Sequence, residues 1–216
     1  MILVALTGGI GSGKSSVSTR LVGRGAVIVD ADAIARELQQ PDGSVFRAMV
    51  DRWGPRIVAE DGTLDRQAVA DIAFKDPTEL KVLNKLVQPA VRREMARRAE
   101  EHGHSGRAVV MDTPLLAESR RPPTPGQYSG VIVVDTPLDV AVARLVAHRG
   151  LREDDAWARA ANQATREQRL AIADFVVDNS GDEADLEAEV GRLWAWLATA
   201  PQVPVPVASP DLAAYQ

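Results

Sequence analysis

Short apolar runs alternate along the chain with longer stretches in which apolar residues recur at helical spacing. The five runs cover residues 2–6, 26–29, 108–112, 130–135 and 173–178. The run at residues 2–6 is unbroken, which is typical of a strand buried on both faces of a parallel sheet, whereas three of the others end in an aspartate and the last also contains Asp174. Between the runs, stripes such as Leu186, Val190 and Leu193 predict amphipathic helices. The alternation predicts a three-layer α/β/α fold around a five-stranded parallel sheet.

A glycine-rich loop follows the first predicted strand and precedes the first predicted helix. It matches the pattern G-x-x-x-x-G-K-[ST] at Gly8, Gly13, Lys14 and Ser15. In this phosphate-loop motif, backbone N–H groups cradle nucleotide phosphates, the lysine reaches the β and γ oxygens, and the serine hydroxyl binds Mg²⁺. The dinucleotide-binding pattern G-x-G-x-x-G fails in both registers, because Lys14 and Ser16 stand where a glycine is required. The sequence therefore predicts a nucleotide-phosphate site of the P-loop NTPase type, formed by Gly8, Gly9, Gly11, Ser12, Gly13, Lys14, Ser15 and Ser16.

Carboxylates at the ends of two predicted strands are candidates for the chemistry of the site. Asp30 and Asp32 come directly after the second run, and Asp112 ends the third. The carboxyl ends of parallel strands line the ligand crevice, so Asp32 is a candidate to accept a proton from an attacking hydroxyl and Asp112 is a candidate Mg²⁺ ligand. The alternatives are that Asp30 and Asp32 only cap the helix that follows, and that Asp112 is a turn residue before Pro114.

Residues 42–105 lack a strong strand pattern and predict a helical insertion between the second and third strands. Pro89 interrupts the last apolar stripe, which predicts a break near Gln88 and a new helix that begins at Pro89. Residues 1–41 and 106–200 then form the core. In a phosphate-loop protein, such an insertion is a candidate lobe for binding the acceptor.

Residues 150–170 continue from Asp155 in a stretch rich in Ala, Arg and Gln, in which Trp157 is the one large apolar residue before Leu170. Helices that bury so little open readily, which is typical of a lid. One or two of the arginines Arg149, Arg152, Arg159 and Arg166 are candidates to close over transferring phosphate, and the alternative for the others is simple surface charge. Arg120 and Arg121, in a proline-rich connection, are candidates for phosphate contact or for solvated loop charge. Asn179, in a turn after the fifth strand, either meets a nucleotide base or only shapes the turn.

Composition narrows the class of protein. The 216 residues are 45% hydrophobic and 25% charged, with a net charge of −5 and no cysteine. Disulfides, a thiolate nucleophile and cysteine-based zinc sites are excluded, and the negative charge argues against a nucleic-acid partner. We expect no membrane segment or secretory signal, a cytoplasmic location and a monomer. Four prolines within residues 201–210 predict a disordered tail over 201–216.

The ordered motifs resemble the dephospho-CoA kinase family. The resemblance runs to about residue 197, through the Gly loop, Asp30-Ala31-Asp32, residues 61–66 (Asp-Gly-Thr-Leu-Asp-Arg), Asp112 with Pro114-Leu115-Leu116, and Asp178-Asn179. It implies transfer of the ATP γ-phosphoryl group to the ribose 3′-hydroxyl of dephospho-CoA, with Mg²⁺ as cofactor. Asp32 matches the family's general base, and Lys14 and Ser15 match its phosphate and Mg²⁺ contacts.

The resemblance also implies the remaining contacts. The resemblance places an ATP-contacting arginine at Arg144 or Arg149, in addition to the candidate ATP contact Asn179. It places the dephospho-CoA contacts at Asp32, Arg36, Gln88 and Leu115. The family usually has His-Pro where this chain has Gln88-Pro89. Glutamine can form hydrogen bonds, but it cannot carry a charge. Two alternatives stay open: another small-molecule P-loop kinase, or a nucleotide-sensing binding module with little turnover.

Overall fold

The computed structural model describes residues 1–119 and 123–206, which form two compact units. The first combines Met1–Val29 with Glu101–Val205, and the second is built on Asp30–Glu100. Each unit has its own hydrophobic core. The second unit begins at Asp30, earlier than the predicted insertion at residue 42. An ion pair between Arg98 and Glu37 ties the helix after Asp30 to the rest of that unit.

A five-stranded parallel sheet forms the centre of the first unit and confirms the predicted α/β fold. Its strands are β1 (Leu3–Gly8), β2 (Val27–Asp30), β3 (Val109–Asp112), β4 (Gly130–Asp135) and β5 (Phe175–Asp178). They lie in the order β2-β3-β1-β4-β5, with Leu3 opposite Val109 and Val4 opposite Gly130. Every residue of β1, β3 and β4 is buried, which explains why apolar residues dominate the sequences of these strands. All five parallel strands end at one edge of the sheet.

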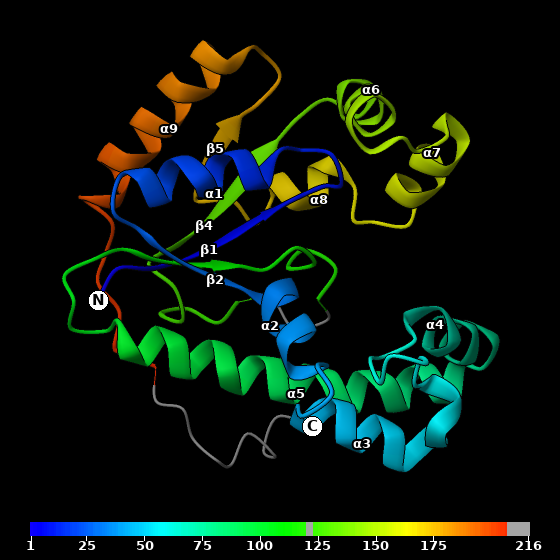
Figure 1. Ribbon diagram of the computed structural model, residues 1–216. Coiled ribbons are helices and arrows are strands. Elements are labelled where there is room, and N and C mark those ends of the chain that lie inside the picture. The colour runs from blue at the N-terminus through cyan, green and yellow to red at the C-terminus, as the bar shows by residue number, and fades with distance from the viewer. Residues whose placement is uncertain (120–122, 207–216) are drawn as a thin grey trace. The chain divides into compact units, whose positions relative to one another are not determined.

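Helices flank this sheet (Figure 1). Those of the first unit are α1 (Lys14–Gly23), α6 (Leu138–Arg149), α7 (Glu153–Ala161), α8 (Arg166–Leu170) and α9 (Glu183–Leu197). Helices α1 and α9 lie side by side, and Leu21 and Leu193 are buried in one cluster with Val4 and Ile132 of the sheet. This shared core fixes α1, the helix that the Gly loop leads into.

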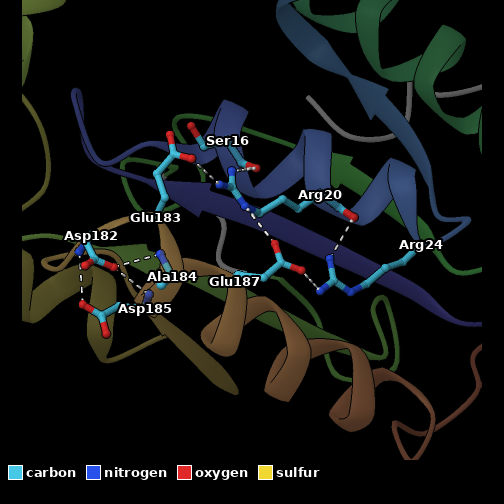
Figure 2. A network of polar contacts seen from close by, with 8 residues as sticks. All are labelled: Ser16, Arg20, Arg24, Asp182, Glu183, Ala184, Asp185 and Glu187. Atoms are coloured by element: carbon cyan, nitrogen blue, oxygen red, sulfur yellow. Dashed lines mark hydrogen bonds and ion pairs between the residues drawn. The ribbon is translucent and has the colours of Figure 1, made fainter.

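Polar contacts reinforce the α1–α9 pair at the surface (Figure 2). Arg20 Nε lies 3.1 Å from Glu187 Oε2, and Arg24 pairs with the same carboxylate. Arg20 also donates to the carbonyl oxygen of Ser16, one turn earlier in α1, at 3.2 Å. The hydrogen bond from Arg24, helped by Arg20, lowers the pKa of Glu187. The network therefore links the first turn of α1 to α9.

The second unit is helical, as predicted for the insertion. It contains α2 (Ala31–Leu38), α3 (Ser44–Trp53), the 3₁₀ helix η1 (Gly54–Ile57), α4 (Arg66–Lys75) and α5 (Pro77–Glu101). Met49, Trp53 and Ile57 form the centre of its core. The indole Nε1 of Trp53 donates to Glu79 Oε2 at 2.7 Å, so the polar edge of this buried ring is satisfied.

The predicted helix break at Gln88 is wrong, because α5 runs without interruption from Pro77 to Glu101 with Pro89 inside it. Pro89 has no N–H to donate to the carbonyl group four residues earlier, a local cost that usually ends or kinks a helix. Beyond it, Ala90, Val91 and Met95 are buried along the same helix. Packing of this face outweighs the cost of the single proline.

Part of the predicted tail is ordered. Val203 is buried, and its carbonyl oxygen accepts from the Met1 nitrogen at 2.8 Å while its N–H donates to Met1 at 3.0 Å. Residues 201–206 therefore depart from the expected disorder. Residues 207–216, like Arg120 and Arg121, lie outside the described part of the chain. Within the described residues, no helix combines the length and the apolar character needed to cross a membrane.

Candidate active site

The Gly loop joins the end of β1 to the start of α1, the arrangement expected of a phosphate loop. Gly11 has φ 75° and Gly13 has φ 85°, both in the left-handed region that favours glycine. A Cβ on Gly11 would lie 2.6 Å from the Ala141 carbonyl oxygen, and one on Gly13 would collide with the Asn179 amide. These two glycines are therefore required by the backbone turn and by its close neighbours.

Residues that directly follow β4 and β5 hold the Ser12 end of the loop. Asn179 Nδ2 donates to the Ser12 carbonyl oxygen at 2.7 Å, and Thr136 Oγ1 lies 3.2 Å from the same oxygen. Arg144 in turn donates from Nη1 to the Asn179 carbonyl at 2.7 Å and from Nη2 to Gly181 at 3.2 Å. The structure thus joins Asn179 and Arg144 to the loop, whereas the side chain of Arg149 is exposed at the end of α6.

An ion pair joins two of the predicted site residues. Lys14 Nζ lies 2.7 Å from Asp112 Oδ1, and Asp112 is buried at the end of β3. Ser15, in the first turn of α1, is exposed. Among the described residues, no group of three or more His, Cys, Asp or Glu side chains is placed to hold a metal. The donors present, a hydroxyl and a carboxylate, fit Mg²⁺, which often takes one or two protein ligands and completes its shell with phosphate oxygens and water.

Residues 150–170, the predicted lid, also contact the loop. Arg166 forms a fork on Asp135 at the end of β4, with Nε 3.0 Å from both carboxylate oxygens and Nη2 2.6 Å from Oδ2. This hydrogen-bonded pair raises the pKa of Arg166. Gln163 Oε1 accepts from the Ile10 N–H at 2.7 Å, and Arg169 lies against Gly9, where a Cβ would come within 3.0 Å of Nη2.

A cavity of about 390 Å³ lies between the Gly loop, the end of β4 and the α7–α8 segment. Its polar lining includes Asp135, Thr136, Gln163 and Arg166. The sequence did not single out Asp135, Gln163 or Arg169. Asp135 ends an apolar run just as Asp112 does, so the same signal identifies it. Gln163 and Arg169 have no such signal, because their partners lie about 150 residues earlier in the chain.

Other predicted residues are on exposed surface. Arg149, Arg152 and Arg159 are exposed, and Arg152 pairs with Asp154 at 3.8 Å. Leu115, after β3, is 58% exposed.

In the second unit, Asp30 is the predicted helix cap: its Oδ1 accepts from the N–H groups of Asp32 at 2.8 Å and Ala33 at 3.0 Å. Asp32, Arg36 and Gln88 are exposed. Since Asp30 already satisfies the start of α2, the carboxylate of Asp32 is not needed as a cap.

Comparison with known proteins decides the family. The family model for dephospho-CoA kinase matches residues 2–185. The chain belongs to the dephospho-CoA kinase family. The dephospho-CoA kinase of Thermobifida fusca is 45% identical over 197 residues, which cover 90% of this chain and 95% of that protein. The enzyme of Streptomyces avermitilis is 47% identical over 195 residues, which cover 90% of this chain and 93% of that protein.

Solved structures agree with the fold. A Thermus thermophilus protein has a TM-score of 0.75 at 33% identity, over 93% of this chain and 98% of that one. The dephospho-CoA kinase of Campylobacter jejuni has a TM-score of 0.67 at 22% identity, over 91% of this chain and 97% of that one, which supports the fold alone. Membership of the dephospho-CoA kinase family makes the protein a P-loop kinase, so a binding module without turnover is not favoured.

Proposed function

We propose that this protein transfers the γ-phosphoryl group of ATP to the ribose 3′-hydroxyl of dephospho-CoA, which yields coenzyme A and ADP. The observation that supports this most directly is a Gly loop in phosphate-loop conformation in a chain of the dephospho-CoA kinase family. Left-handed Gly11 and Gly13 turn the loop backbone into the start of α1, whose free N–H groups favour phosphate.

Asp32 is the proposed general base. Its carboxylate accepts the proton of the 3′-hydroxyl as that oxygen forms a bond to the γ-phosphorus, while the bond from the γ-phosphorus to the bridging oxygen breaks and ADP leaves. The exposed position of Asp32 and the cap supplied by Asp30 leave this carboxylate available for that step.

Lys14 is the proposed phosphate contact. In the structure its ammonium group is neutralised by Asp112, and we propose that it turns to the β and γ oxygens when ATP binds. Ser15 and Asp112 would hold Mg²⁺, which when bound offsets negative charge on those phosphates. Lys14 and the loop N–H groups orient the γ-phosphoryl group for in-line attack.

The remaining contacts complete the proposal. Arg144, Arg149 and Asn179 bind the ATP side, and Arg36, Gln88 and Leu115 bind the dephospho-CoA side. Residues 150–170 act as the lid, where Arg166 and Arg169 are the arginines that lie nearest the loop region. A monomer in the cytoplasm stays a prediction.

An acceptor screen tests the proposal. The protein is incubated with ATP, Mg²⁺ and one acceptor at a time, with ADP release followed continuously and products identified by mass spectrometry. ADP release that requires dephospho-CoA, together with a phosphorylated product at the mass of coenzyme A, is the expected result. Phosphorylation of a different small hydroxyl compound, with dephospho-CoA inert, would overturn the acceptor while leaving the kinase class in place.

A further inference from the structure

The turn between α7 and α8 is bonded to three different segments at one edge of the sheet. Gln163 accepts from the Ile10 N–H, the Ala164 N–H donates to Glu118 Oε1 at 2.9 Å, and Arg166 forks on Asp135. These partners follow β1, follow β3 and end β4, three strands that are neighbours in the sheet. The turn is therefore seated at defined points across the carboxyl ends of three strands.

The contact at Ile10 has a defined chemistry. A backbone N–H only donates, so the side chain of Gln163 must present its carbonyl oxygen to it, at 2.7 Å. The Gln163 N–H itself donates to the Ala160 carbonyl at 3.1 Å, which holds the residue at the end of α7. Glutamine supplies an acceptor without a charge, and a carboxylate at this place would repel nucleotide phosphates.

Residues 9–13 belong neither to β1 nor to α1, so individual contacts hold their shape. The Ser12 end is held by Asn179 and Thr136, which directly follow strands β5 and β4. The Ile10 end is held by Gln163, which belongs to the lid region. The two ends of the loop are thus supported by different parts of the fold.

We propose that Gln163 is a positioning residue for the phosphate loop: it holds the Ile10 N–H, so the outer turn of the loop keeps its phosphate-binding shape when the α7–α8 turn is seated. This rests on the proposed kinase function. Without the contact, the loop would also adopt other conformations. The apparent ATP affinity would then fall in proportion to the fraction of molecules that keep the binding-competent loop conformation. The chemical step, once ATP is bound, would change little.

Three variants test the contact in the full-length protein without nucleotide. Gln163→Met keeps the size but removes the acceptor, Gln163→Glu keeps the acceptor, and Asn162→Ala is the control because Asn162 bonds within α7, to Ala158 at 3.0 Å. Loss of one neutral hydrogen bond should speed hydrogen exchange of the Ile10 amide about fivefold in Gln163→Met. Gln163→Glu and Asn162→Ala should keep the wild-type rate. An unchanged rate in Gln163→Met, or an equal rise in Asn162→Ala, overturns the proposal.

A second measurement separates positioning from catalysis. By the same reasoning, Gln163→Met should weaken ATP binding about fivefold in titration calorimetry without acceptor. The kcat with dephospho-CoA should stay within about twofold of wild type, as expected when only ground-state binding is lost. A fall in kcat at unchanged ATP affinity overturns the positioning role. Because the exchange and calorimetric arms need no acceptor, a wrong acceptor assignment would show itself separately, as wild-type protein that binds ATP and does not phosphorylate dephospho-CoA.

Discussion

At the scale of single residues, Lys14 and Asp112 form an ion pair between two of the predicted site residues. Their side chains are 17% and 9% exposed, so water screens the ion pair weakly. The pair explains how Lys14, which we propose contacts phosphate, and a carboxylate at a buried strand end are both accommodated before a nucleotide binds. It also makes each residue part of the stability of the first unit.

The first prediction concerns this pair. Lys14→Met should lower the free energy of unfolding by about 2 kcal/mol, because a charge-assisted hydrogen bond to a buried carboxylate is lost. In a double-mutant cycle with Asp112→Asn, measured by urea denaturation, the two changes should be strongly non-additive. The exposed pair of Arg152 and Asp154, 80% and 89% exposed, is the control, and Arg152→Met should change stability by less than about 0.5 kcal/mol. Additive effects at Lys14 and Asp112 would contradict the prediction.

The second prediction concerns the proposed base. Asp32→Asn should lower kcat by about 10² to 10⁴-fold with little change in the KM for ATP, because asparagine cannot take the proton. Steady-state kinetics with dephospho-CoA measure both constants. Asp51→Asn, which removes another exposed carboxylate of the same unit, should behave as wild type. An unchanged kcat in Asp32→Asn would rule out the base assignment.

At the scale of elements, α5 shows how packing overrides a local signal. Its 25 residues include Pro89, with no N–H available for the carbonyl group of Lys85. The helix nevertheless continues, because residues on both sides of Pro89 contribute to the core of the second unit. Proline marks the end of a helix only on average. Here the buried face of α5 stabilises the helix enough for it to continue through Pro89.

The third prediction follows from this helix. Pro89→Ala should raise the free energy of unfolding by about 1 to 3 kcal/mol, since alanine restores a helix hydrogen bond and removes the ring. Chemical denaturation at fixed pH measures the change. Pro77→Ala is the matched control, because Pro77 opens the helix, where an N–H is not required, and little change is expected. A destabilised Pro89→Ala would mean that α5 depends on a bend at this position.

Helices α7 and α8, which lie in the predicted lid, bury little, as their composition predicted. Ala156 is the buried residue of α7, and the short helix α8 has none. Polar contacts at Gln163, Ala164 and Arg166 therefore account for much of what holds this segment in place. Movement of the segment during the reaction stays a prediction.

At the scale of the whole molecule, several carboxylates have lowered pKa values in the folded state. The clearest is Glu94, where the hydrogen bonds from Arg97 and Arg98, each 2.8 Å long, bring the pKa down to about 2. Hydrogen bonds from Arg52 and Trp53 lower the pKa of Glu79, and the hydrogen bonds with Ser180 lower that of Asp178. The folded protein therefore binds fewer protons than the unfolded chain at mildly acidic pH.

The fourth prediction is a loss of stability in acid. A carboxylate with a lowered folded-state pKa stabilises the fold fully above its unfolded pKa, and this contribution disappears as the pH falls towards the folded value. For Glu94 the window runs from about pH 4.5 down to about pH 2. Allowing for solvent screening, its share is about 1 to 2 kcal/mol. Glu94→Gln should flatten the pH dependence of unfolding in this window, whereas exposed Glu60→Gln should retain the wild-type slope. Equal slopes in all three proteins would contradict the assignment.

Local patterns were enough to place most elements and part of the site. The apolar runs located all five strands, and the order of strand, Gly loop and helix located the phosphate loop. The role of Asp30 as a helix cap could also be predicted, since this residue stands directly before an amphipathic helix. The ion pair between Lys14 and Asp112 could not be predicted, because 98 residues separate the two in the sequence. The pairing of β1 with β3 brings them together.

The sequence by itself determined the class of fold, the phosphate loop and the resemblance that the comparisons confirmed, because these depend on short-range patterns of apolar, glycine and charged residues. Tertiary structure decided that α5 continues through Pro89, that Arg144 reaches the loop through Asn179, and that Gln163 and Arg169 lie against it. The physical reason is the same in each case. The deciding partner comes from a distant segment, and the free energy of that packing or hydrogen bond is not encoded at the residue's own position.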